Sequence, residues 1–216
     1  MLSCVDHIYV VELSGGEAFL HPNLDEVIQA CLDTGKVGHI SVLSNGTVIP
    51  GAETLAALRE AKATVQISKY SCVPTSKAEA LKRVLEENEI SYVHAGVRSW
   101  HDMGRFAQLQ AGSAKRRFSL CILTLCFVYF KGKLHRCSGK AAILSEEGCL
   151  PDCEGDYIDL REIHPRGFPE ALKKLLKKHV TSACSYCLGG TYKSPEIPVA
   201  AQRQSRESDI QRRDMP

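Results

Sequence analysis

Ten cysteines in a chain of 216 residues are the first feature that points to chemistry. Two of them form the pair Cys184-x2-Cys187, while Cys121 and Cys137 flank a β-rich stretch that turns at 131–133. Four thiolates that converge from a hairpin and a tight Cys-x2-Cys can hold a [4Fe–4S] cluster. The same set can instead hold a tetrahedral zinc ion. The spacing therefore predicts a four-cysteine metal site and leaves both occupants open.

Other cysteines compete for these roles or have simpler explanations. Cys126 also precedes the hairpin, so it is an alternative to Cys121 as the first ligand. Cys149 and Cys153 form a further pair, but free thiols in a loop describe them better. Cys31 falls in the apolar pattern of a helix, where a packed thiol is expected.

Two short polar segments follow predicted strands. The first is Ser14-Gly15-Gly16-Glu17 and the second is Ser44-Asn45-Gly46. Glycines let a backbone turn tightly and bring its amides close to a ligand, and a carboxylate placed there can accept hydrogen bonds from an ammonium group. Asn and Gly also tolerate left-handed backbone geometry. Each segment is therefore a candidate ligand loop, with a plain structural turn as the alternative.

These loops need a frame that brings them together. Residues 1–95 alternate between short β-rich runs and segments of helical periodicity. Such a chain forms parallel βα units, and its ligands gather beyond the carboxyl ends of the strands. An open sheet and a partial barrel both fit this alternation. The predicted strands are 8–13, 39–43, 64–68 and 90–94, and the predicted helices are 24–32, 53–61 and 76–88.

The pattern changes after residue 95. An irregular stretch, 96–115, contains Trp100 and His101, which we expect to be a buried tryptophan and a loop histidine. Two β-rich pieces within 118–137 predict a hairpin, and His135 beside it is expected at the surface. The acidic segment 149–165 reads as a loop. An amphipathic helix is expected over 168–179, with a solvated lysine face formed by Lys173, Lys174, Lys177 and Lys178.

The first ligand loop carries a family resemblance. The segment Glu12–Leu24 resembles the second-strand segment of radical S-adenosylmethionine (SAM) enzymes, in which a hydrophobic strand is followed by Gly-Gly-Glu-Pro; Ala18 replaces that proline here. The segment 44–46 is similar to the Thr-Asn-Gly that follows their third strand. By this resemblance the residues that bind SAM are Gly15, Gly16 and Glu17 at its amino group, Ser44 and Asn45 beside them, and Ser68 near its ribose.

The cysteine order carries a second resemblance. The order of the cysteines resembles that of the auxiliary-cluster module called twitch, the shortened form of the SPASM domain. This order is a cysteine, a hairpin glycine, four residues, a second cysteine, a long gap and then Cys-x2-Cys. Such modules bind one extra [4Fe–4S] cluster. The resemblance implies that the ligands are Cys121, Cys137, Cys184 and Cys187.

The defining motif of the same family, Cys-x3-Cys-x2-Cys, occurs nowhere in the sequence. The expectation is therefore a fragment of a longer enzyme, inactive as written. Its complete form would cleave SAM reductively to a 5′-deoxyadenosyl radical, with an external one-electron donor and an unknown peptide or small-molecule substrate. Two alternatives stay open: a non-enzymatic iron–sulfur or zinc module, and a degenerate relative that binds SAM without cleaving it.

The combined expectation is an α/β fold. A partial (β/α) radical SAM (TIM-like) barrel lacking its first strand spans 1–112, a cysteine-rich hairpin and helix module spans 113–192, and a disordered polar tail spans 193–216. A formal net charge of +2 gives no electrostatic case for nucleic acid. The longest apolar runs are too short for a bilayer, and no signal peptide begins the chain, so a cytoplasmic protein is expected.

Overall fold

The computed structural model describes residues 2–70, 74–97, 100–103, 109, 113–137, 155–191 and 194–199. The chain divides into two compact units. The sheet unit holds residues 10–33, 39–100 and 198–216, and the cysteine unit holds residues 1–9, 34–38 and 101–197. The predicted boundary after residue 112 lies outside the described ranges, as does most of the predicted tail.

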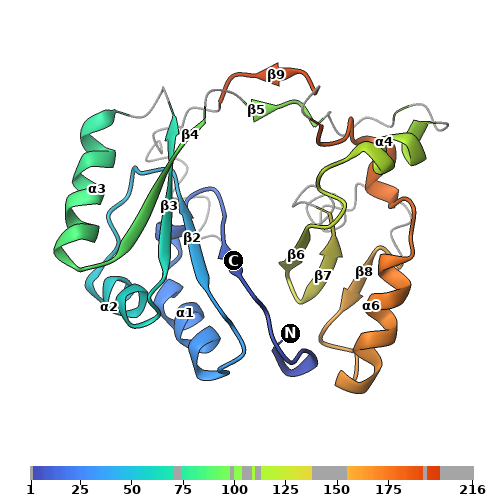
Figure 1. Ribbon diagram of the computed structural model, residues 1–216, viewed down its shortest axis with the longest axis horizontal. Coiled ribbons are helices and arrows are strands. Elements are labelled where there is room, and N and C mark those ends of the chain that lie inside the picture. Colours follow the sequence, from blue (N-terminus) through green and yellow to red (C-terminus); the bar gives the residue numbers. More distant parts are fainter. Residues whose placement is uncertain are drawn as a thin grey trace, which may run out of the picture. The chain divides into compact units, whose positions relative to one another are not determined.

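A parallel four-stranded sheet in the order β1-β2-β3-β4 forms the centre of the sheet unit (Figure 1). The prediction of an α/β fold with parallel βα units is confirmed, and each predicted strand and helix of this region is present. The elements are β1 (Val11–Leu13), η2 (Ala18–Leu20), α1 (Leu24–Asp33), β2 (Ile40–Ser44), α2 (Ala52–Glu60), β3 (Thr64–Tyr70), α3 (Thr75–Glu87) and β4 (Ser91–Val97).

The three helices of this unit lie on one face of the sheet (Figure 1). Their apolar stripes bury Ile28, Leu58 and Leu81 completely, against strand residues such as Val42 and Val65. These side chains recur at helical spacing on the helices and at alternate positions on the strands, which explains why the sequence specifies both periods here.

The opposite face of the sheet is polar and partly open. Alternation along the strands places Ser41, Gln66 and Ser68 on it, and the Gln66 side-chain amide donates to Ser41 Oγ at 2.7 Å. Val93, on the same face of β4, is half exposed. A parallel sheet is usually apolar on both faces, so this polar face is suited to lie beside a polar ligand or solvent.

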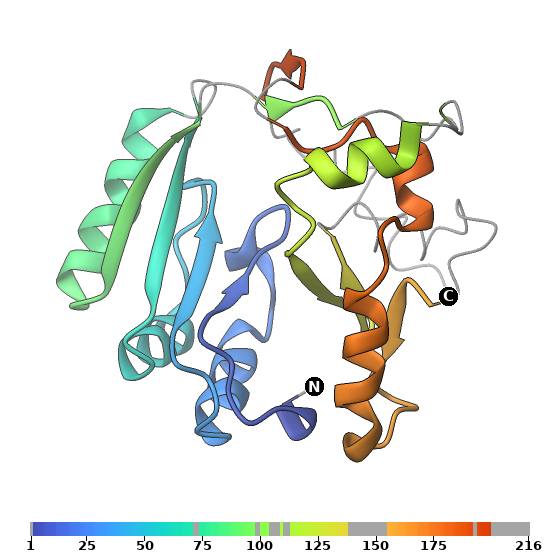
Figure 2. The same ribbon diagram turned by 45° about the vertical axis from the view of Figure 1, so that its right-hand side comes forward.

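The cysteine unit is built on an antiparallel sheet in the order β6-β7-β8, with α6 packed beside it (Figure 2). Its core contains Leu134, Ile158, Phe168 and Leu175. The elements are η1 (Leu2–Cys4), α4 (Ala114–Leu120), β6 (Phe127–Phe130), β7 (Lys133–Arg136), β8 (Tyr157–Asp159), η4 (Pro165–Gly167), α6 (Phe168–Leu176), η5 (Ser182–Tyr186) and β9 (Glu196–Ile197); β5 (Trp100–His101) lies at the division between the units.

The predicted hairpin is confirmed as β6 and β7. Lys131 and Gly132 form its two-residue turn with φ of 46° and 82°, the geometry of a type I′ turn. A Cβ at Gly132 would lie 2.6 Å from Cδ of the exposed, flexible Arg161 side chain, which would have to shift, so the positive φ is the main reason for glycine there.

Three smaller expectations were wrong or incomplete. Trp100 is 39% exposed rather than buried. His135 is 1% exposed rather than at the surface, because β7 is the central strand of its sheet. Lys178 is not simply solvated, since its ammonium group forms an ion pair with the buried Asp156 at 2.6 Å.

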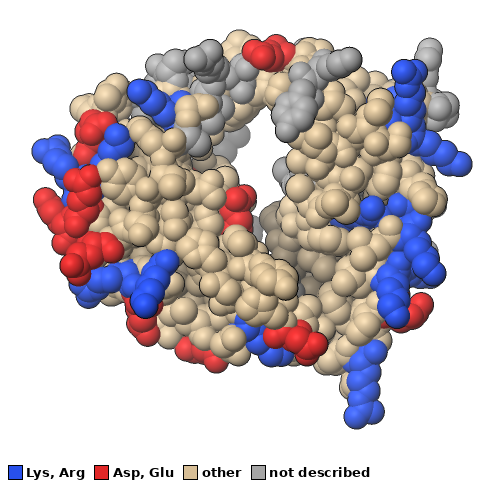
Figure 3. Space-filling model, in the orientation of Figure 1, with Lys and Arg blue, Asp and Glu red and all other residues tan. Residues whose placement is uncertain are grey.

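The surface charges differ between the units. Figure 3 shows Lys and Arg side chains gathered over α4 and α6, whereas both signs mix over the helices of the sheet unit. In the parts of the chain that are described, no helix has the length and apolar character that a membrane span needs.

Candidate metal centre and ligand loops

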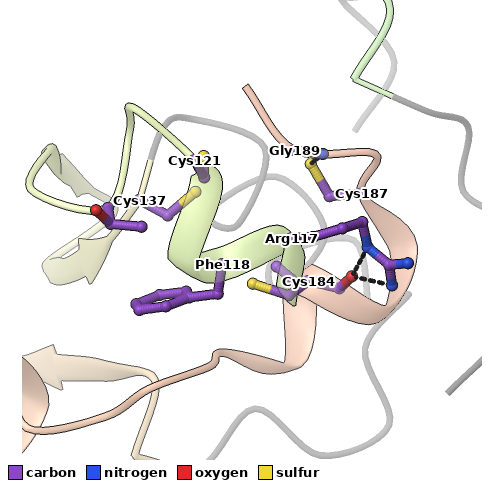
Figure 4. A pocket seen from close by; sticks show the side chains of 9 residues that line it. Arg117, Phe118, Cys121, Cys137, Cys184, Cys187 and Gly189 are labelled. Carbon is purple, nitrogen blue, oxygen red and sulfur yellow. Dashed lines mark hydrogen bonds between the residues drawn. The ribbon is translucent and has the colours of Figure 1, made fainter. Parts of the chain in front are cut away.

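One pocket of the cysteine unit brings the four predicted cysteines together. They approach it from segments that lie up to 66 positions apart, between Cys121 and Cys187. The other lining groups are mostly apolar or backbone. The lining residues are Arg117, Phe118, Cys121, Thr124, Cys137, Ala183, Cys184, Cys187 and Gly189 (Figure 4).

Each cysteine stands at an element end or in a tight turn. Cys121 is the C-cap of α4, and Cys137 directly follows β7. Cys184 lies within η5, and Cys187 ends it in an extended conformation. Because these positions are fixed by short elements, the thiols are presented by ordered backbone rather than by long loops (Figure 4).

The alternative ligand Cys126 is placed differently. Its side chain is exposed, and it is not among the lining residues of the pocket. Its backbone carbonyl instead accepts a hydrogen bond from Cys137 N at 2.8 Å, which extends the hairpin by one pair. Cys149 and Cys153 lie outside the described residues.

Arg136 ties the hairpin to the rest of the unit. Its buried guanidinium donates to the carbonyl oxygens of Thr124 (2.9 Å), Leu175 (2.9 Å), Leu176 (2.7 Å) and Lys178 (2.9 Å). Two of these carbonyls belong to the last turn of α6 and that of Lys178 lies just beyond it, where a cation is favoured by the helix dipole. This one side chain therefore fixes the residue before Cys137 against both α6 and the pocket wall.

Asp156 fixes the other pair of cysteines. Its buried carboxylate accepts hydrogen bonds from the Lys178 ammonium group and from Ser182 N, the first residue of η5. Arg117 acts on the same turn, donating through Nε (3.2 Å) and Nη2 (2.8 Å) to the carbonyl oxygen of Cys184. The sequence pattern did not single out Arg136, Asp156 or Arg117 for this role, since their contacts span 12 to 67 positions of the chain.

Polar groups lie within hydrogen-bond distance of three of the pocket sulfurs. The Gly189 N–H lies 3.3 Å from Cys187 Sγ and the Gly190 N–H lies 3.2 Å from Cys121 Sγ. Thr181 Oγ1 is 3.4 Å from Cys184 Sγ. Hydrogen bonds to the ligating sulfurs are one of the features by which proteins tune bound iron–sulfur clusters.

Cys137 has a strained backbone. Its φ is 97°, in the left-handed region that glycine tolerates and a cysteine rarely adopts. Such strain costs about 1–3 kcal/mol and persists where the surroundings impose it, often at functional sites. The strain at a pocket-lining cysteine therefore favours a functional role for this position.

A pocket with four thiols suits soft metal chemistry, because thiolates select zinc and iron–sulfur clusters over hard cations. Within the described ranges, no group of three or more His, Cys, Asp or Glu side chains is placed to hold a metal ion as it stands. The pocket thus offers a fitting donor set without the geometry of a completed site.

The candidate ligand loops of the sheet unit are joined by Glu17. This carboxylate is buried, and it accepts hydrogen bonds from Phe19 N at 3.1 Å and from Asn45 N at 2.7 Å. The second loop is braced further, since Ser44 Oγ accepts from Gly46 N at 3.0 Å and Asn45 Oδ1 accepts from Thr47 N at 2.9 Å. The two segments predicted to bind one ligand therefore meet.

Gly15 and Gly16 lack a packing reason to be glycine. Both are exposed, neither has a positive φ, and nothing lies within 4 Å of a Cβ built on either one. Their backbone is open to an approaching molecule. Ser68 lies inside β3, two residues before its end, on the polar face of the sheet.

Comparisons with known proteins add no assignment. No family model matches the chain, and no curated protein matches it.

Proposed function

We propose that this chain is an iron–sulfur protein of the radical SAM type, in which Cys121, Cys137, Cys184 and Cys187 hold an auxiliary [4Fe–4S] cluster. The observation that carries the proposal is that these four thiols line one pocket. Such a cluster, when bound, supplies a site for one-electron transfer. The chain's own residues orient the four sulfurs, donate N–H groups to two of them, and surround them with apolar groups that limit the access of water.

The sheet unit supports the second part of the proposal, the binding of SAM. The Gly15-Gly16 backbone is open, and Glu17 ties it to Asn45 at the carboxyl edge of the strands, where parallel α/β folds bind ligands. The polar sheet face with helices on the other side fits the inner face of a partial barrel. An external one-electron donor and a peptide or small-molecule substrate complete the proposed reaction.

The cluster is tested by anaerobic reconstitution with ferrous iron and sulfide. We expect a brown protein that absorbs visible light and contains the four iron ions of one [4Fe–4S] cluster per chain. Single Ser substitutions of the four pocket cysteines should each lower the iron content strongly. The matched control is Cys126→Ser, whose exposed thiol lies outside the pocket; it should retain the wild-type iron content.

One outcome would replace the proposal and another would amend it. Tightly bound zinc after purification without iron, and no uptake of iron and sulfide, would identify a zinc module. Iron loss in Cys126→Ser together with retention in Cys121→Ser would reassign the first ligand.

SAM binding is tested by calorimetry on Gly15→Val and Gly16→Val. Because both positions have free space and no positive φ, the variants should fold as well as the wild type. We expect them to lose SAM affinity by tenfold or more. Gly96→Val, on β4 with equally free space, is the matched control and should bind SAM normally. Wild-type protein that binds no SAM would refute this part alone.

A further inference from the structure

Two consecutive backbone amides meet two of the four pocket sulfurs. The Gly189 N–H points to Cys187 Sγ at 3.3 Å, and the Gly190 N–H points to Cys121 Sγ at 3.2 Å. The second of these bonds spans 69 positions of the chain. One short turn therefore contacts sulfurs from both halves of the proposed ligand set.

The turn is built for this close approach. Gly189 has a φ of +84°, and a Cβ at Gly190 would lie 2.8 Å from Cδ1 of Leu123. The carbonyl of Gly190 accepts a hydrogen bond from Ile122 N at 2.9 Å. Gly190 is thus bound from both its N–H and its carbonyl to the segment that begins at Cys121.

Ser194 holds the turn from the other side. Ser194 is buried. Its hydroxyl donates a hydrogen bond to the carbonyl oxygen of Gly189 at 2.8 Å and accepts one from Thr191 N at 3.1 Å. These two bonds bracket Gly190. The first bond restrains the peptide plane between Gly189 and Gly190, whose N–H faces Cys121 Sγ, and the second restrains the next plane along the chain.

We infer that Ser194 is a positioning residue which aims the amide of Gly190 at Cys121, and that this amide helps to set the reduction potential of the bound cluster. The inference rests on the proposed function. Reduction adds negative charge to a cluster and its thiolates, and N–H donors stabilise that charge. Loss of the Gly190 donor should therefore make the cluster harder to reduce.

The experiment compares reconstituted wild type with Ser194→Ala, Ser194→Thr and Ser119→Ala. Ser119 is an exposed serine of α4 and serves as the matched control. Iron content is measured first, and the reduction potential is then measured by a dye-mediated titration followed by electron paramagnetic resonance. Ser194→Ala should keep its iron, and its potential should fall by about 30–60 mV, which is a three- to tenfold change in the one-electron equilibrium. Ser194→Thr, which keeps the hydroxyl, and Ser119→Ala should match the wild type.

A wild-type potential in iron-loaded Ser194→Ala would overturn the inference and leave the proposed cluster intact. Wild-type protein without iron would overturn the proposed function first. If Ser194→Ala loses its iron, wild type grown with ¹⁵N-glycine gives the answer. The reduced cluster should then show ¹⁵N hyperfine couplings in pulsed electron paramagnetic resonance, and their absence would refute the contact.

Discussion

The carboxylate of Glu17 accepts a hydrogen bond from the backbone N–H of Asn45 at 2.7 Å, so the loop after β1 is tied directly to the loop after β2. These loops lie 28 positions apart in the chain. The Glu17 side chain therefore has a structural role, and any contact that it makes to SAM has to coexist with these hydrogen bonds.

Replacing Glu17 by alanine should destabilise the sheet unit. The change leaves two backbone N–H groups, those of Phe19 and Asn45, without their acceptor, and a buried polar group that loses its partner costs about 1–3 kcal/mol. Urea unfolding followed by circular dichroism measures the loss. Glu12→Ala, at an exposed acid of the neighbouring strand, should change the free energy of unfolding by less than about 0.5 kcal/mol. Equal effects at the two positions would contradict the role assigned to Glu17.

Replacing Arg136 by methionine should destabilise the cysteine unit by about 3 kcal/mol, because four carbonyl oxygens lose a charged donor. Arg136→Lys should rescue little, since a single ammonium group cannot reproduce the fork of a guanidinium. The exposed Arg166→Met is the control. The free energy of unfolding in denaturant and the iron content after reconstitution should both fall in the Arg136 variants. Normal iron content in a destabilised variant would show that Arg136 does not support the metal site.

Cys137→Gly should have opposite effects on stability and on metal binding. Glycine relieves the strain at φ of 97°, so the metal-free protein should gain about 1 kcal/mol of stability. The same change removes a proposed ligand, so iron uptake should fall. Thermal unfolding of the metal-free variant and iron analysis after reconstitution check the two halves. A variant that is less stable than the wild type would show that the cysteine side chain itself packs favourably.

Acid should weaken one contact of β8. The Arg161 guanidinium, and then its backbone N–H, lower the pKa of Asp159 from 3.8 to about 2. A lowered folded-state pKa stabilises the fold above about pH 4, and this contribution is lost as the pH falls from about 4 to 2. The stability difference between wild type and Asp159→Asn should therefore be constant near neutral pH and shrink over that range. A difference that stays constant down to pH 2 would contradict the pairing.

The sheet unit could be predicted from the sequence because its signals are local. The segment 24–32 has a helical apolar stripe and 39–43 is a short β-rich run, and each prediction lies within one residue of the observed bounds of α1 and β2. The polar face of the sheet was not predicted, because the sequence does not show which face of the sheet the helices cover.

The cysteine unit was harder to predict. α4 has only seven residues, and its last three, from Phe118 onward, lie in the stretch predicted to form the hairpin. β8 has only three residues, which is too short to show the alternation of apolar and polar residues that indicates a strand. The choice between Cys121 and Cys126 depends on where α4 ends, and the role of Arg136 depends on contacts about 40 positions away. The spacing of the cysteines alone predicts neither the first ligand nor the role of Arg136.

Native mass spectrometry of the anaerobically reconstituted chain tests the central proposal most directly. We predict one dominant species whose excess mass equals four iron and four sulfide ions, and its disappearance when all four pocket cysteines are replaced by serine. An unchanged mass, the mass of a single zinc ion, or a cluster that survives the fourfold replacement would contradict it.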